Sequence, residues 1–157
     1  HGAGGEGGHV TVDYEETDCC GCGNKGCLEQ YGSATGIAKL AAKRLAKDDA
    51  PSVLRNKPFV SAKAVFDAVK ENDAVAIEIA EEFGDYLGKG LATIAAVVNP
   101  EVFVIGGGVS KAGEILFKYI EPVMIKHTFH GCRNVELKLA TLDNDAGIFG
   151  AAALFLM

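Results

Sequence analysis

The sequence predicts an α/β fold, and two observations carry this prediction. In residues 101–157, short apolar runs typical of strands alternate with helical segments, and a glycine turn joins the first strand to the next helix. Upstream, three segments place apolar residues at helical spacing, each preceded by a serine or aspartate that can cap a helix. Helices and strands that alternate in this way are typical of α/β proteins.

The first regular segment is residues 9–13, where apolar and polar side chains alternate and predict a short strand. Residues 14–27 follow as an irregular segment rich in cysteine and glycine. The serine that opens residues 33–47 is a predicted N-cap, and the apolar positions behind it recur at helical spacing. Residues 48–58 contain two prolines and are predicted to be a loop, after which Ser61 caps a second helix.

Asp73 is predicted to cap the longest helix, whose apolar residues form one stripe as far as Val98. Pro100 ends this helix because the residue before a proline avoids helical backbone angles. Residues 101–105 then form an apolar run of the kind found in buried parallel strands. A helix over residues 112–126, a strand over residues 135–140 and a helix from Asp145 to the carboxyl end complete the prediction.

A glycine turn follows the strand at residues 101–105. Backbone without Cβ atoms can approach a nucleotide closely, and a helix N-terminus offers free N–H groups and a positive dipole end. The turn consists of Gly106, Gly107, Gly108 and Val109. The turn alone does not separate a nucleotide site from a structural turn, because it completes neither a Walker loop nor a dinucleotide fingerprint.

The composition limits the function. A chain of 157 residues with 48% hydrophobic and 23% charged residues is expected to form one globular domain. A net charge of -6 without a Lys/Arg-rich block argues against nucleic-acid binding, and no apolar run is long enough to cross a membrane. Four of the five cysteines lie within residues 19–27, which makes a poor disulfide framework and favours a reducing cytoplasm.

The most informative motif spans residues 20–29, Cys-Gly-Cys-Gly-Asn-Lys-Gly-Cys-Leu-Glu, with His9 upstream. Thiolates and imidazole are the donors of closed tetrahedral zinc sites, and the interleaved glycines allow a tight knuckle. Ordinary buried thiols or a disulfide are the alternative, but this spacing is unusual for core packing. The expected zinc ligands are His9, Cys20, Cys22 and Cys27. Cys19 and Cys132 are expected to lie outside the site.

Two carboxylates flank this motif. Glu6 precedes His9 by three residues, and Glu29 closes the cysteine segment. Because the knuckle folds the chain back, both carboxylates can face one cavity, where they would accept hydrogen bonds from a polyhydroxylated ligand such as a sugar. Two solvated surface glutamates are the alternative that the residues alone leave open.

Three segments resemble the ROK family, which groups bacterial sugar kinases, chiefly glucokinases, with sugar-responsive repressors. They are residues 6–31 with the cysteine motif, residues 99–110 with the strand and glycine turn, and residues 145–152 in the last helix. The cysteine motif is highly specific, and the resemblance covers essentially the whole chain. One position departs from the pattern, because Gly7 stands where the family more often has isoleucine.

The resemblance implies an actin/hexokinase-like (ribonuclease H-like) fold with a zinc knuckle, incomplete in this chain. Residues 1–157 resemble the carboxyl-terminal sugar- and ATP-binding half, and the catalytic base is expected in the absent amino-terminal half. The implied zinc ligands are the four named above. The implied sugar ligands are Glu6, His9 and Glu29, and the glycine turn would line the adenosine pocket.

The implied function of the intact protein is ATP-dependent phosphorylation of a hexose, and glucose is the expected substrate. Mg²⁺ would accompany ATP, and zinc with four protein ligands would be structural because it has no open position. A sugar-responsive repressor body, a kinase for another hexose or N-acetylhexosamine, and a stand-alone zinc-stabilised binding module are the alternatives. The intact protein is expected to be a cytoplasmic homodimer, and the isolated chain is expected to be inactive.

Overall fold

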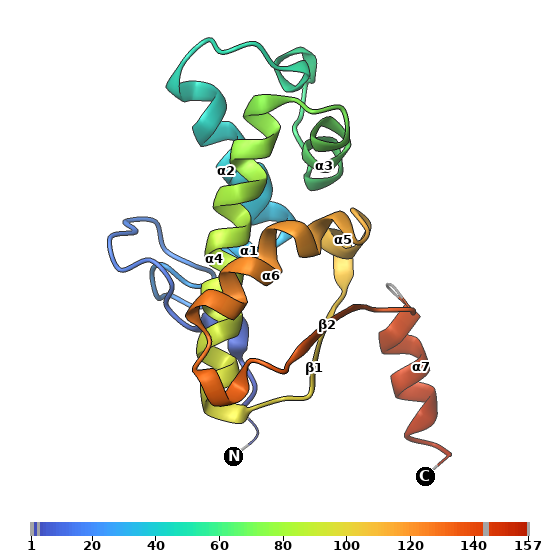
Figure 1. Ribbon diagram of the computed structural model, residues 1–157. Coiled ribbons are helices and arrows are strands. Elements are labelled where there is room, and N and C mark those ends of the chain that lie inside the picture. Colours follow the sequence, from blue (N-terminus) through green and yellow to red (C-terminus); the bar gives the residue numbers. More distant parts are fainter. Residues whose placement is uncertain (1, 3, 143–144, 157) are drawn as a thin grey trace.

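The computed structural model describes residues 2, 4–142 and 145–156. A long central helix, α4, organises these residues, with α6 beside it and α7 set apart at one side (Figure 1). The helices are α1 (Glu29–Gly32), α2 (Ala34–Lys47), α3 (Ala62–Lys70), α4 (Ala74–Val98), α5 (Gly107–Ser110), α6 (Ile115–His127) and α7 (Ala146–Ala153). The strands are β1 (Val102–Ile105) and β2 (Glu136–Leu139), and 3₁₀ helices lie at Gly7–His9, Val53–Asn56 and His130–Cys132.

Three helices begin at the caps that the sequence predicts. The side chains of Ser33, Ser61 and Asp73 each accept a backbone N–H bond from three residues further on, at 3.0, 3.2 and 3.0 Å. Each bond satisfies an N–H group that the first helical turn leaves free. At the other end of α4, Asn99 adopts the left-handed conformation with φ of 44° before Pro100. The predictions for α2, α3 and α4 are therefore confirmed.

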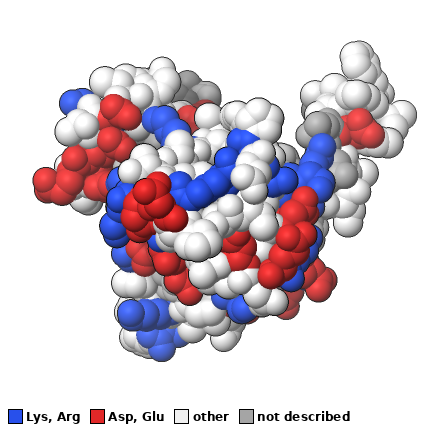
Figure 2. Space-filling view, turned by 90° about the horizontal axis from the view of Figure 1, so that it is seen from above, with Lys and Arg blue, Asp and Glu red and all other residues white. Residues whose placement is uncertain are grey.

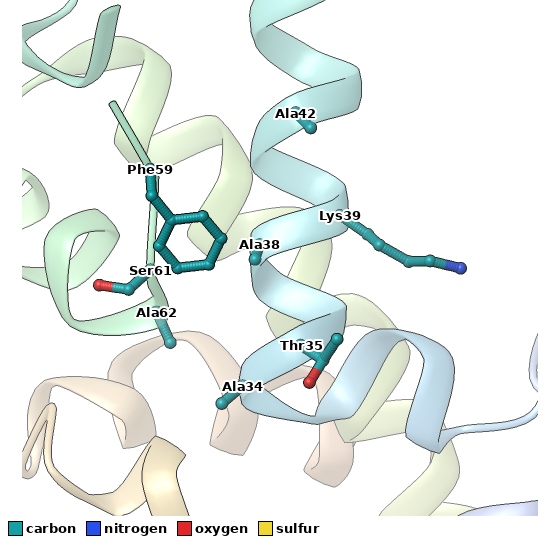
Figure 3. Close-up of a pocket in the computed structure, with 8 residues that line it drawn as sticks. All are labelled: Ala34, Thr35, Ala38, Lys39, Ala42, Phe59, Ser61 and Ala62. Carbon is teal, nitrogen blue, oxygen red and sulfur yellow. The ribbon is translucent and has the colours of Figure 1, made fainter. Parts of the chain in front are cut away.

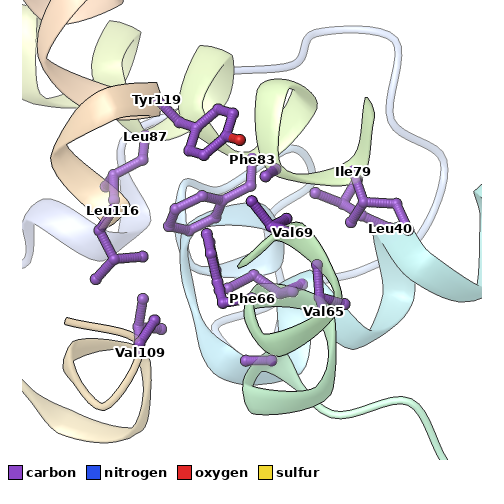
Figure 4. Close-up of a cluster of buried hydrophobic side chains, with 14 of the residues drawn as sticks. Leu40, Val65, Phe66, Val69, Ile79, Phe83, Leu87, Val109, Leu116 and Tyr119 are labelled. Atoms are coloured by element: carbon purple, nitrogen blue, oxygen red, sulfur yellow. The ribbon is translucent and has the colours of Figure 1, made fainter. Parts of the chain in front are cut away.

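The hydrophobic core lies where α4 meets α2, α3 and α6 (Figure 4). The apolar stripe predicted along α4 enters this core through Phe83, whose ring meets the edge of Phe66 at a centroid distance of 5.9 Å. Gly84 allows α6 to approach closely, since a Cβ there would lie 2.4 Å from the carbonyl oxygen of Tyr119. The stripe leaves the core at its end, where Val98 is exposed.

The two strands pair in parallel, as the alternation of elements predicts, and Val102–Ile105 align with Glu136–Leu139. The prediction that residues 101–105 are buried is wrong for one face of the sheet. Phe103 and Ile105 pack against the core, whereas Val104 is 60% exposed. The described residues form only these two strands and cover only one side of them, so alternate side chains point outward.

The predicted strand at residues 9–13 is also wrong. Gly7–His9 form a 3₁₀ turn, and Thr11 makes a single antiparallel bridge with Cys27. The ladder cannot extend because the partner segment enters α1 two residues later. Gly26, on the other side of that bridge, adopts φ of 68°.

Other boundaries differ more modestly from the predictions. The loop predicted at residues 48–58 contains the 3₁₀ helix, and α6 begins three residues later than expected because Gly113 adopts φ of 84°. Helix α7 begins near Asp145 as predicted and ends at Ala153, whereas Met157 lies outside the described residues.

The surface carries mixed charge. On the face shown in Figure 2, Lys and Arg side chains are interspersed with Asp and Glu. Within the described part of the chain, every helix is too short or too polar to cross a lipid bilayer.

Candidate metal centre and ligand site

Four side chains that the sequence predicts as zinc ligands meet in one cluster. The ligand atoms of His9, Cys20, Cys22 and Cys27 all lie within 4.8 Å of one another. Cys20 Sγ lies 3.7 Å from His9 Nδ1, and Cys22 Sγ lies 3.6 Å from Cys27 Sγ. A zinc–sulfur bond of about 2.3 Å in a tetrahedron separates two sulfurs by about 3.8 Å. The cluster therefore fits a closed four-ligand metal site in both donor type and spacing.

Tight turns bring these thiols together. The Cys20 N–H donates to the carbonyl of Asn24 at 2.7 Å, and Gly23 between them adopts φ of 91°. Gly26 packs directly on the preceding limb of the loop, where an added Cβ would lie 1.7 Å from the carbonyl oxygen of Asp13. The interleaved glycines thus provide the backbone freedom that the sequence predicts.

The thiols differ in environment. Burial raises the pKa of Cys27 to about 12, because the side chain has no exposed surface on which to solvate a thiolate. Cys22 is exposed, and the backbone N–H of Asn24 lowers the pKa of its thiol. Cysteine binds metals as the thiolate, so a cation in the cluster would offset the cost of ionising the buried member.

The two predicted carboxylates lie on either side of the same imidazole. His9 Nε2 is 3.9 Å from Glu6 Oε2, and His9 Nδ1 is 3.8 Å from Glu29 Oε2. Glu29 also accepts a hydrogen bond from the Cys20 thiol at 3.5 Å. The carboxylates are largely exposed, at 72% and 57%, whereas the imidazole is only 31% exposed. The structure thus brings Glu6, His9 and Glu29 together on an accessible face.

Two hollows meet at the start of α2. One, of about 310 Å³, is lined by Glu29 and Cys20 and extends along α2 past Ser33. The other, of about 370 Å³, contains the glycine turn of residues 106–109 together with Ser33 and Ala34. Because Ser33 lines both hollows, the start of α2 lies between the hollow beside Glu29 and the glycine turn.

A third hollow continues from Ala34 along α2. It has a volume of about 470 Å³, and its walls are mostly apolar. Figure 3 shows the ring of Phe59 facing Ala38 across this groove, while Lys39 points away from it. The groove offers an apolar space next to the glycine turn, because Ala34 borders both.

Three residues of the glycine turn, Gly107 to Val109, belong to the short helix α5, and the longer α6 begins only at Ile115. Gly107 adopts φ of 69°, which only glycine takes without strain, and a Cβ placed there would have no neighbour within 4 Å. At Gly108 an added Cβ would lie 3.4 Å from the Cβ of Ala34. The turn therefore has open space beside Gly107 and lies against α2 at Gly108.

Two buried side chains that the sequence analysis did not single out support the site. Tyr31 donates its hydroxyl hydrogen toward Glu16 at 2.7 Å and Asp13 at 2.9 Å. Tyr86 of α4 also donates to Asp13, at 3.1 Å, and its ring stacks on Tyr31 at a centroid distance of 3.9 Å. The second buried side chain is Gln30, which follows Glu29 directly. Only knowledge of which side chains near the motif are buried could have identified Tyr31 and Gln30, because neither residue type indicates a binding site by itself.

A parallel two-stranded unit with its glycine turn, joined to a Cys₃His cluster flanked by carboxylates, matches a known class of protein. The ROK family model matches residues 1–157, and the chain belongs to this family. A glucokinase from Halalkalibacterium halodurans is 40% identical over 161 residues, covering 98% of this chain and 48% of that protein.

Solved structures agree with this assignment. A ROK family glucokinase from Streptomyces griseus in complex with glucose and AMPPNP superposes with a TM-score of 0.84 at 29% identity, over 96% of this chain and 51% of that one. A ROK family transcriptional regulator, a homologue of the E. coli MLC protein, superposes at 0.73 with 30% identity, over 88% and 35%. The fold is the expected actin/hexokinase-like one, and the chain spans about half the length of the glucokinases it matches.

Proposed function

We propose that this chain is the sugar- and nucleotide-binding half of an ATP-dependent hexose kinase, with glucose as the substrate. The observation that carries the proposal is the pair of exposed carboxylates, Glu6 and Glu29, each less than 4 Å from His9. Carboxylate oxygens and a ring N–H are strong partners for sugar hydroxyls. The glucokinase relatives supply the class of reaction, and the substrate follows from them by similarity.

Zinc would be held by the four-ligand cluster, whose soft donors and spacing suit that ion. When bound, it would cross-link the loop and leave no open position for catalysis. His9 presents Nδ1 to Cys20 and Nε2 toward Glu6. Holding Nδ1 in the cluster would fix the ring so that Nε2–H points at the sugar, which would couple the metal to substrate orientation.

ATP would place its adenosine at Gly106, Gly107, Gly108 and Val109. The open space at Gly107 supports this, and the apolar groove beyond Ala34 offers room for a base. We call the surface formed by Glu6, His9 and Glu29 the sugar face. This face and the glycine turn lie on either side of Ser33, so the γ-phosphoryl group could point from the turn toward the sugar. Mg²⁺ would accompany the phosphates, and the rest of the intact protein would supply the base that takes the hydroxyl proton.

The remaining parts of the proposal concern the intact protein. We place it in the cytoplasm, where ATP is available and thiols such as these remain reduced. We also assign the absent half of the site to an amino-terminal segment, so that this chain alone should not turn over. Dimer formation stays a prediction.

The test measures sugar binding by the zinc-loaded chain, using calorimetric titration with glucose. Glu29→Gln keeps the shape of the side chain and removes its charge, and a hydrogen bond to a charged group contributes about 1.5–3 kcal/mol. The affinity for glucose should fall by about one to two powers of ten, with the melting temperature nearly unchanged. Glu71→Gln, an exposed carboxylate at the end of α3, is the matched control and should leave binding unchanged.

Equal losses of stability and binding in Glu29→Gln would assign the carboxylate to the fold and contradict the proposal. A phosphorylation assay on the same chain should show no turnover, and a rate within about tenfold of an intact glucokinase would overturn the assignment of the base.

A repressor body is the second candidate, because a ROK transcriptional regulator shares this fold. Both candidates bind sugar, so nucleotide binding separates them. Protection of the glycine turn from hydrogen exchange by an ATP analogue would favour the kinase. Sugar binding without nucleotide binding would favour the repressor, and a panel of hexoses and N-acetylhexosamines would test the choice of glucose.

A further inference from the structure

Gln30 links the two ends of the cysteine loop. It is the second residue of α1 and only 9% exposed. Its side-chain oxygen accepts the backbone N–H of Cys27 at 3.0 Å, and its side-chain nitrogen donates to the carbonyl of Asp18 at 3.0 Å. Its own backbone N–H donates to the carbonyl of Cys27 at 2.9 Å. One amide therefore joins residues on either side of the turn that carries the other cysteines.

These bonds matter because they tie the turn that carries Cys20 and Cys22 to the segment that carries Cys27. The bonds of the turn itself, from the Cys20 N–H to the Asn24 carbonyl and in the bridge between Cys19 and Lys25, stay inside it. The thiols also reach across, because Cys20 Sγ lies 3.5 Å from Glu29 Oε2 and Cys22 Sγ lies 3.6 Å from Cys27 Sγ. Gln30 adds a link that does not depend on a thiol, since Asp18 lies two residues before Cys20.

We propose that Gln30 is a positioning residue that sets the distance between Cys20, Cys22 and Cys27 in the candidate metal site. A primary amide suits this task, because it accepts at one atom and donates at the other. A carboxylate would keep the bond from the Cys27 N–H and lose the bond to Asp18. An apolar side chain of equal length would lose both bonds.

The same residue connects the metal site to the sugar face. Glu29 precedes Gln30 in the four-residue helix α1, and its carboxylate lies 3.5 Å from Cys20 Sγ. Once Gln30 fixes α1 against the loop, the carboxylate is fixed relative to the thiols. This inference rests on the metal site of the proposed function and is independent of which sugar binds.

The experiment measures zinc affinity by competition with a chromophoric chelator and records the cobalt(II) absorption spectrum of the full 157-residue chain. Gln30→Met and Gln30→Glu are the test variants. Asn56→Asp is the matched control, because it makes the same change from amide to carboxylate at an exposed residue of the 3₁₀ helix Val53–Asn56, outside the cysteine segment. Loss of partners that orient metal ligands typically lowers metal affinity by about 10–100-fold. We expect that loss, together with altered cobalt ligand-field bands, in Gln30→Met and Gln30→Glu. We expect near wild-type behaviour of Asn56→Asp.

The outcomes separate three cases. In the first case, the wild type binds cobalt and zinc tightly with tetrahedral geometry, and Gln30→Met keeps the same affinity and spectra. This result overturns only the role of Gln30 and leaves the metal site standing. Failure of the wild type to bind either metal overturns the metal site, and the positioning role with it, while leaving the glucose titration to judge the sugar site. Loss of helical circular dichroism in both test variants assigns Gln30 to the global fold and also contradicts the inference. The expected result is retained helicity with weakened, distorted metal binding.

Discussion

Tyr31→Phe tests how the loop is attached to the helical core. The tyrosine hydroxyl lies 2.7 Å from Glu16 Oε2 and 2.9 Å from Asp13 Oδ2, so it joins the first limb of the loop to α1. Phenylalanine keeps the ring and its stacking on Tyr86 but removes this donor. The substitution therefore isolates the hydrogen bond from the apolar burial.

The magnitude follows from one hydrogen shared between two acceptors. A hydroxyl donates once, so the two short distances count as one bond to a carboxylate, worth about 1.5–3 kcal/mol. Both carboxylates are partly exposed, and Tyr86 continues to donate to Asp13. We therefore expect the lower part of this range, a loss of about 1.5–2 kcal/mol in the free energy of unfolding near pH 7.

The loss should depend on pH in a defined direction. The backbone N–H of Glu15 and the Tyr31 hydroxyl hold the pKa of Asp13 below its usual range, and the N–H of Asp18 and the same hydroxyl do so for Glu16. A lowered pKa in the folded state stabilises the fold above the unfolded pKa of about 4, and this stabilisation is lost as the pH falls. The difference between wild type and Tyr31→Phe should shrink between about pH 5 and pH 3.

Urea unfolding followed by far-ultraviolet circular dichroism provides the measurement, at neutral and acidic pH, with a chelator present so that metal release does not contribute. Tyr14→Phe is the matched control, because Tyr14 is 86% exposed and should give no change. An unchanged free energy of unfolding in Tyr31→Phe at neutral pH would refute the reasoning. A deficit that persists undiminished in acid would show that the carboxylates are not the acceptors that matter.

Two further substitutions probe the cluster itself. Cys22→Ala should abolish stoichiometric zinc binding, measured by chelator competition, and with it glucose affinity, measured by calorimetric titration. Cys132→Ala, outside the cluster, is the control and should change neither. Full glucose affinity in metal-free protein would contradict the structural role of the metal. Gly26→Ala should destabilise the loop by about 1–3 kcal/mol, because the new Cβ meets Asp13 at a residue with φ of 68°. Gly23 also has a positive φ, of 91°, but an added Cβ there would meet nothing within 4 Å. Gly23→Ala should therefore lose less free energy of unfolding in urea. Equal losses in the two variants would mean that the contact with Asp13 is unimportant.

Local signals explain what could be predicted from the sequence. The helices α2, α3 and α4 follow from a cap and an apolar stripe, both written within a few residues of the helix. The metal cluster follows from a compact motif, because soft donors at short spacing have few other uses. His9 is predicted with it despite the distance in sequence, because an imidazole eleven residues before Cys20 completes a Cys₃His donor set.

What escaped prediction depends on partners distant in the sequence. Alternation at residues 9–13 describes a side-chain pattern, but a strand also needs a neighbour, and the segment around Cys27 supplies only one bridge. The apolar run at residues 101–105 predicted burial on both faces, yet Val104 is exposed because the described residues leave one face uncovered. The role of Gln30 could not be read either, since its two partners are fixed only when the loop closes.

The position of His9 would couple the proposed metal site to the proposed sugar site. An imidazole free to rotate would present its two nitrogens in several directions, and a sugar would have to order it on binding. Here Nδ1 lies against Cys20, and Nε2 lies on the Glu6 side of the ring. A metal held through Nδ1 would therefore order the His9 ring when the protein folds, before the sugar binds. On this argument a metal in the cluster would raise sugar affinity without contacting the sugar, because it would remove conformational freedom from His9, the proposed sugar ligand.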